Sequence, residues 1–184
     1  MSHKILAFAG STRQGSFNRS ILDHAVTGAQ AAGAEVTLID LRDYSLPLYN
    51  GDLEISHGVP DSAMRLKELF KSHDGLLLAC PEYNSSITPL LKNTLDWVSR
   101  PHGEESGLVP YHNKLALLVA ASAGNLGGLR GLRHVREILT TLGVMVLPTQ
   151  LAVSQADQPL DDNMKTRLLN AGAELATALS RWKA

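Results

Sequence analysis

The hydrophobic positions of the chain form five short apolar runs, separated by longer segments with helical spacing. The runs are rich in Val, Ile, Leu and Ala and do not alternate with polar residues, which is typical of strands covered on both faces. They occupy residues 5–9, 36–39, 75–79, 115–121 and 144–147. Because strands of parallel sheets are buried in this way, the pattern predicts a parallel sheet.

Between and after these runs, apolar residues recur with the period of an α-helix. The helical segments are residues 18–32, 61–72, 88–99, 128–142 and 161–182. Asn18, Asp61 and Thr88 are candidate N-caps, and Gly33 and Gly143 stand where two of the helices should end. A strand followed by a helix, five times over, predicts an α/β fold: a doubly wound five-stranded parallel sheet, strand order 2-1-3-4-5, with helices on both faces.

Length and composition fit a single domain over residues 1–184, with 44% hydrophobic residues and no break in composition. Lys and Arg number 17 against 18 Asp and Glu, a formal net charge of −1. Such a balance provides no field that would attract nucleic acid or an anionic membrane. We therefore expect small molecules or proteins as partners, with no nucleic acid and no membrane.

Three features bear on compartment and metal content. The sequence has one cysteine, Cys80, so an internal disulfide is excluded. Its N-terminal apolar run is too short for a secretory signal, and its longest apolar stretch, residues 115–121, is far below the roughly 20 residues that span a bilayer. The seven histidines show no metal-ligand spacing. These features predict a cytoplasmic protein without a metal site.

The stretch Gly10-Ser-Thr-Arg-Gln-Gly-Ser-Phe-Asn18 joins the first strand to the first helix. Backbone N–H groups at a helix start lack internal partners and lie at the positive end of the helix dipole, so such a turn binds anions. Ser11 and Ser16 add hydroxyl groups, and Arg13 adds a full positive charge. The pattern is neither a dinucleotide Gly-x-Gly-x-x-Gly nor an NTPase loop ending in Lys-Ser/Thr. A terminal phosphomonoester is the best candidate ligand.

Two further polar loops, residues 81–87 and 122–128, follow the third and fourth predicted strands. In a doubly wound sheet the ligand crevice lies at the carboxyl ends of the strands, so the three loops should converge on one ligand. Pro81, Tyr83 and Asn84 suit the edge of a flat heterocycle. The glycines of the last loop allow close approach of a ring to backbone N–H groups. A phosphate at one end and a planar ring at the other describe a mononucleotide.

These motifs resemble those of the NADPH-dependent FMN reductases of flavodoxin-like fold, which include bacterial quinone and chromate reductases. The resemblance spans residues 4 to about 147 and rests on Gly10-Ser-Thr-Arg-Gln-Gly-Ser-Phe-Asn-Arg19, Leu46-Pro-Leu-Tyr-Asn50 with Asp52, Pro81-Glu-Tyr-Asn84, Leu91-Lys-Asn-Thr-Leu-Asp-Trp-Val-Ser-Arg100, and residues 122–128. Family members often carry a second aromatic residue after the Asn and glycines before Leu-Lys-Asn. This chain departs there with Ser85, Ser86, Thr88, Pro89 and Leu90, so we expect substrate access to differ.

The resemblance implies a set of FMN-binding residues. The phosphate and ribityl chain would contact Ser11, Arg13, Ser16, Phe17 and Asn18. The strip along the isoalloxazine would be formed by Pro81, Glu82, Tyr83 and Asn84, with Glu82 contributing through its backbone. Ser122 and Gly124 would lie at the far edge of the ring.

The resemblance also implies an activity and an assembly. NADPH or NADH reduces FMN in a two-electron ping-pong cycle and is then replaced by an acceptor such as a quinone, an azo compound, a free flavin or chromate. Because the cofactor carries this chemistry, no side chain is assigned a catalytic role. The family implies a homodimer or homotetramer, with residues 46–50 and the helix that holds Trp97 near the interface.

Two other functions compete with this interpretation. A one-electron carrier of the flavodoxin type would bind FMN without using nicotinamide, but such carriers are usually strongly acidic, and a net charge of −1 gives little electrostatic steering. A small phosphatase would need a nucleophile in its anion-binding loop, and residues 10–18 contain no cysteine or aspartate. Arg19 is interpreted as a solvated side chain and Cys80 as a buried one.

Overall fold

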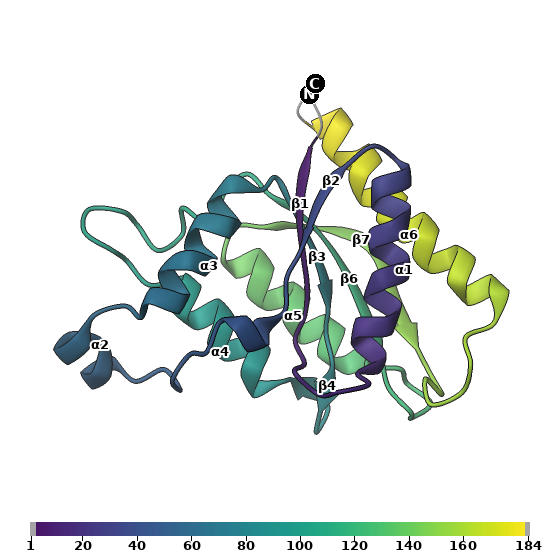
Figure 1. The fold of residues 1–184 in the computed structure, drawn as a ribbon, viewed down its shortest axis with the longest axis horizontal. Coiled ribbons are helices and arrows are strands. Elements are labelled where there is room, and N and C mark those ends of the chain that lie inside the picture. Colours follow the sequence, from purple (N-terminus) through teal and green to yellow (C-terminus); the bar gives the residue numbers. More distant parts are fainter. Residues whose placement is uncertain (1–2, 183–184) are drawn as a thin grey trace.

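The five predicted strands form one parallel sheet between two layers of helices (Figure 1). The computed structural model describes residues 3–182. The strands of the sheet are β1 (Lys4–Ala9), β2 (Glu35–Leu38), β3 (Gly75–Ala79), β6 (Leu115–Ala121) and β7 (Met145–Val153). Their order is β2-β1-β3-β6-β7, and every neighbouring pair is parallel. Numbered within the sheet alone, this is the predicted order 2-1-3-4-5, which is confirmed.

The two faces of the sheet have separate hydrophobic cores. Helices α1 (Phe17–Ala31) and α6 (Asp162–Trp182) cover one face, and α3 (Asp61–Ser72), α4 (Pro89–Val98) and α5 (Leu129–Thr141) cover the other (Figure 1). Successive side chains of a strand point to opposite faces, so in β1 Ala7 packs under the first layer and Phe8 under the second. Burial on both sides explains why the strands are continuous apolar runs.

Two glycines let α1 and α6 pack backbone against backbone. A Cβ atom at Gly28 would lie 1.9 Å from the carbonyl oxygen of Leu169, and one at Gly172 would lie 1.8 Å from that of Ala25. Neither position has room for a side chain. This close contact holds α6 against α1, the helix that follows the anion-binding turn.

Helix ends differ in part from the predicted caps. Thr88 caps α4 as expected, with its hydroxyl accepting from Leu91 N at 3.3 Å. Gly33 and Gly143 end α1 and α5 with φ of +88° and +91°. The cap prediction is wrong for Asn18, because α1 begins at Phe17 and the Asn18 side chain bonds to Ala121. It is also wrong for Asp61, which is the first residue inside α3.

Three segments of the chain contain structure that the sequence pattern did not predict. Residues 41–60 contain a 3₁₀ turn, η1 (Leu41–Asp43), and a short helix, α2 (Gly51–His57), which buries no residue and so has no apolar face. Residues 82–87 form a hairpin of two-residue strands, β4 (Glu82–Tyr83) and β5 (Ser86–Ile87), too short to show periodicity. Strand β7 continues past Pro148 to Val153, since an edge strand tolerates a proline that interrupts the apolar run.

The described part of the chain lacks both a membrane-spanning helix and a metal-binding cluster. None of the helices within residues 3–182 has the length and apolar character needed to cross a bilayer. The same residues contain no cluster of three or more His, Cys, Asp or Glu side chains that could hold a metal ion.

Candidate functional site

The turn between β1 and α1 presents a group of unsatisfied backbone donors. Gly10 N–H donates to Ala79 O at 2.8 Å, which anchors the start of the turn to β3. Ser16 is the N-cap of α1, but its hydroxyl makes no capping bond. Within residues 3–182, no protein acceptor bonds the N–H groups of residues 14–18. Free donors at the positive end of a helix form an anion site.

Arg13 is held over this helix start. Its backbone N–H donates to Ser11 Oγ at 3.3 Å, and its guanidinium carbon lies 4.8 Å from the centre of the Phe17 ring. The stacking on Phe17 orients the group but uses none of its N–H donors. Among the described residues, Arg13 has no carboxylate partner, so its charge is available to a ligand.

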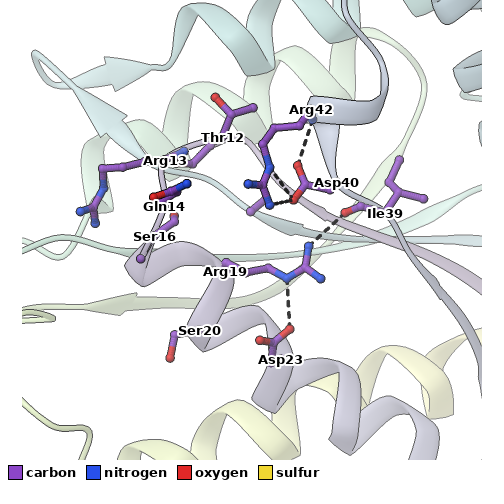
Figure 2. Close-up of a pocket in the computed structure, with 13 residues that line it drawn as sticks. Thr12, Arg13, Gln14, Ser16, Arg19, Ser20, Asp23, Ile39, Asp40 and Arg42 are labelled. Carbon is purple, nitrogen blue, oxygen red and sulfur yellow. Dashed lines mark hydrogen bonds and ion pairs between the residues drawn. The ribbon is translucent and has the colours of Figure 1, made fainter.

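A cavity of about 440 Å³ opens beside the turn, between α1 and the segment after β2 (Figure 2). Two other arginines line it, and both are paired: Arg19 Nε lies 3.3 Å from Asp23 Oδ1, and Arg42 donates twice to Asp40, at 2.7 and 3.1 Å. Those bonds from Arg42 hold the pKa of Asp40 below its usual value. In Figure 2, Arg13 points away from the paired group. Arg19 Nη1 also donates to Ile39 O at 3.3 Å, so this side chain ties α1 to the segment after β2.

Asn18 lies at the same helix start with its side chain turned inward. It is buried, its Nδ2 donates to Ala121 O at 2.8 Å, and its Oδ1 accepts from Ala121 N at 3.0 Å. The side chain thus joins α1 to the end of β6. Its backbone N–H belongs to the group of free donors in the turn.

The loop after β3 is a hairpin rather than an irregular segment. Asn84 and Ser85 have φ of +47° and +68°, as a two-residue type I′ turn requires. Tyr83, at the tip, is 57% exposed. At the base, Thr88 Oγ1 donates to Gly10 O at 2.9 Å, so the hairpin is bonded directly to the anion-binding turn.

The turn and the hairpin face a common cavity of about 410 Å³. Its lining comes from the turn (Gly10, Ser11, Thr12, Arg13) and from the hairpin and α4 (Tyr83, Thr88, Pro89, Leu90). The structure therefore brings the predicted phosphate and ring segments together, as the topology of the sheet predicts.

The carboxylate of Glu82 faces away from this cavity and toward α5. Glu82 Oε2 accepts from Gly131 N at 2.8 Å, and Oε1 lies 3.4 Å from Arg130 Nε. The side chain is only 10% exposed. This agrees with the expectation that Glu82 would offer a ligand its backbone and not its carboxylate.

The third loop, residues 122–128, is bonded to residues 155 and 156, a segment that the sequence pattern did not indicate. Ser122 O accepts from Ala156 N at 3.0 Å, and Gly124 O accepts from Gln155 N at 3.4 Å. Within residues 3–182, the N–H groups of Ala123 and Gly124 have no protein acceptor. The carbonyl groups of Ser122 and Gly124 are thus bonded to residues 156 and 155, while the N–H donors remain available to a ligand.

Gly127 and Gly128 make the start of α5 possible. Their φ values are +60° and +91°, and a Cβ on Gly127 would lie 2.6 Å from the Val153 carbonyl carbon. Only glycine fits this backbone path between β6 and β7.

Cys80 lies next to the site but within the core. It is fully buried, and its thiol donates to Leu78 O at 3.6 Å. Burial raises the pKa of the thiol far above its ordinary value. The buried position predicted for Cys80 is confirmed.

The chain is similar to known proteins both in sequence and in fold. A family model described as NADPH-dependent FMN reductase matches residues 3–158. An NAD(P)H-dependent FMN reductase of Pseudomonas aeruginosa is 36% identical over 159 residues, covering 86% of this chain and 81% of that protein. A quinone reductase of Escherichia coli is 34% identical over 149 residues, covering 80% and 76%. The solved flavoenzyme NAD(P)H:(acceptor) oxidoreductase FerB of Paracoccus denitrificans has the same fold, with a TM-score of 0.80 at 22% identity over 97% of this chain and 98% of that one.

Proposed function

This chain belongs to the NADPH-dependent FMN reductase family, and on that premise we propose that it is an FMN-dependent NAD(P)H oxidoreductase that reduces quinones. The structural observation that carries the proposal is the set of N–H donors in residues 14–18 next to Arg13. Within residues 3–182, these donors have no protein acceptor and Arg13 has no carboxylate partner. The flavodoxin-like fold and the family expected from the sequence are both confirmed.

The turn fits the phosphate of FMN. Donors from the first turn of α1 and the Arg13 guanidinium would bind its oxygens, with the hydroxyl groups of Ser11 and Ser16 completing the site. Phe17 would contribute its N–H and the ring on which Arg13 stacks. Asn18 would act through its N–H, while its amide holds the turn in place.

The ring would lie between the hairpin and the third loop. Pro81, Glu82, Tyr83 and Asn84 would form the strip along it, and Ser122 and Gly124 its far edge. Free N–H donors of the third loop would stabilise negative charge on the ring. When bound, FMN supplies two-electron transfer from NADPH or NADH to the acceptor, and the chain's residues bind and orient it.

The acceptor class follows from the relatives, which include a protein named quinone reductase. We extend it to azo compounds, free flavins and chromate, the other acceptors that the family resemblance implies. We further propose that residues 1–184 act as one domain in the cytoplasm.

A homodimer or homotetramer is supported by the loop between β2 and α3. Trp97 Nε1 donates to Pro47 O at 2.8 Å, which holds this loop against α4. Yet Leu48 and Ile55 on the same loop are 78% and 87% exposed. Exposed apolar side chains that gather in a patch are typical of a protein interface.

The absorbance of the purified protein tests the function. FMN should give the protein a yellow colour, and NADPH or NADH under nitrogen should bleach it, with colour returning on addition of a quinone. Bound FMN that stays oxidised in excess NADPH and NADH contradicts the enzyme and favours a one-electron carrier. Failure to bind added FMN contradicts the cofactor assignment.

A further inference from the structure

Glu82 belongs to the hairpin assigned to the ring, yet its carboxylate lies at the N-terminus of α5. Besides its bond to Gly131 N at 2.8 Å, it approaches Arg130 Nε at 3.4 Å and is almost fully removed from solvent. A Cβ at Gly131 would lie 3.3 Å from Glu82 Cβ, so the hairpin and the helix are in close contact.

Helix α5 has no acidic group of its own at this end. Its N-cap is Gly128, which has no side chain to cap with, and its first turn contains no Asp or Glu. A carboxylate at a helix N-terminus offsets the partial positive charge there. Glu82 thus supplies, from a different loop, the charge and the acceptor that the helix start lacks.

The same contact links two of the ring-binding segments. Gly128 ends the third loop and begins α5, and a Cβ there would lie 3.8 Å from Glu82 Cβ. Ser86 Oγ and His134 Nδ1, 2.9 Å apart, make a second link between the hairpin and α5. The Glu82 side chain therefore joins the hairpin to the first turn of α5, which directly follows the third loop.

We propose that Glu82 is a positioning residue that also lowers the reduction potential of the bound FMN by offsetting the positive end of α5. The inference rests on the proposed function. Uptake of two electrons and one proton leaves the cofactor with one more negative charge than before, and the positive end of a helix stabilises such charge. The Glu82 carboxylate opposes this stabilisation. Reduced FMN would therefore be a stronger electron donor toward the acceptor than it would be without the Glu82 charge.

The test is an anaerobic redox titration of the FMN-loaded protein against a reference dye. Glu82→Gln removes the charge but keeps an oxygen that accepts from Gly131 N. We expect the midpoint potential to rise, with reduced FMN bound about 10-fold more tightly relative to oxidised FMN, which is about 30 mV for a two-electron couple. Glu137→Gln, an exposed position later on α5, is the matched control and should leave the potential unchanged.

Arg130→Gln provides an independent test with the opposite sign. Its side chain is half-exposed, so its removal does not disturb the core, and loss of the positive charge beside Glu82 should lower the potential. The inference is overturned if Glu82→Gln leaves the potential at the wild-type value, or if Glu137→Gln shifts it equally. Should Glu82→Gln not fold, an unchanged potential in Arg130→Gln overturns it. A wild-type protein that binds no FMN overturns the proposed function itself, and this inference with it.

Discussion

The side-chain amide of Asn18, in the first turn of α1, pairs with both backbone groups of Ala121 at the end of β6. The two hydrogen bonds are 2.8 and 3.0 Å long and buried. Ala121 is followed directly by the third loop, and Asn18 by the helix whose start forms the anion site. This side chain therefore ties the proposed phosphate site to the proposed far edge of the ring site.

Replacing Asn18 by Ala should destabilise the fold and weaken FMN binding together. Both buried Ala121 groups would lose their partners, at a cost of about 2–4 kcal/mol in the free energy of unfolding. Urea unfolding and FMN titration measure the two effects. Gln30→Ala, an exposed position on the same helix, is the control and should change neither. A variant at Asn18 with wild-type stability would show that water replaces the amide.

The two arginines near the turn should behave differently. Arg13→Ala removes an unpaired charge from the phosphate site and should weaken FMN binding roughly 10- to 100-fold, the value of a hydrogen bond to a charged group. Arg19→Ala removes a guanidinium already bonded to Asp23 and Ile39 O, so it should leave FMN affinity close to that of the wild type. Quenching of FMN fluorescence on binding measures both. Equal losses in the two variants would mean that the phosphate lies in the cavity lined by Arg19.

The contact between α1 and α6 should not accept even one methyl group. At Gly28 the added carbon would meet Leu169 O, so Gly28→Ala forces the helices apart and should lower the free energy of unfolding by about 2 kcal/mol or more. This is expected although Ala favours helices by about 1 kcal/mol over Gly. Thermal and urea unfolding measure it, with the exposed neighbour Thr27→Ala as control. A stabilised Gly28 variant would contradict the close packing.

His73 should make the fold sensitive to mild acid. Its Nδ1 lies 2.6 Å from Leu69 O and must donate, and its Nε2 lies 2.7 Å from Thr37 Oγ1, a hydroxyl group that donates to the neutral ring. Burial lowers the pKa of His73 from the ordinary 6.5. As pH falls below 6.5, the unfolded chain binds a proton that the folded protein does not, so stability falls. The loss continues down to the pKa of His73 in the folded protein.

Urea unfolding of the wild type and of His73→Gln at several pH values between 7.5 and 5 checks this expectation. The wild type should lose stability faster than the variant as pH falls. The two proteins differ only at position 73, so the difference between their curves reports on His73. A constant difference between the two across this range would mean that His73 titrates normally in the fold.

Cys80 should be inert toward thiol reagents in the folded protein. It is fully buried and burial raises the pKa of its thiol, so the reactive thiolate is not formed near neutral pH. An aromatic disulfide reagent should leave the native protein unlabelled and react completely in urea. Rapid labelling of the native protein would show that the end of β3 opens to solvent.

Much of the architecture could be predicted because it depends on the local pattern of apolar and polar residues along the chain. Continuous apolar runs such as residues 115–121 mark doubly buried strands, and helical spacing marks the segments between them. The strand order then places the three polar loops at one edge. Arg13 and Tyr83 were identified in this way, and the structure places them around one cavity.

The amino-acid sequence by itself determined the five-stranded sheet, the helices that cover its two faces and the three loops that meet at its edge, because each depends on residues that are neighbours along the chain. Tertiary structure decided what individual side chains do there. Asn18 bonds Ala121, 103 positions away, and Glu82 bonds Gly131, 49 positions away. Such pairs become partners only after the strands between them have been placed, since a hydrogen bond needs its two groups within about 3 Å and no local pattern specifies that distance.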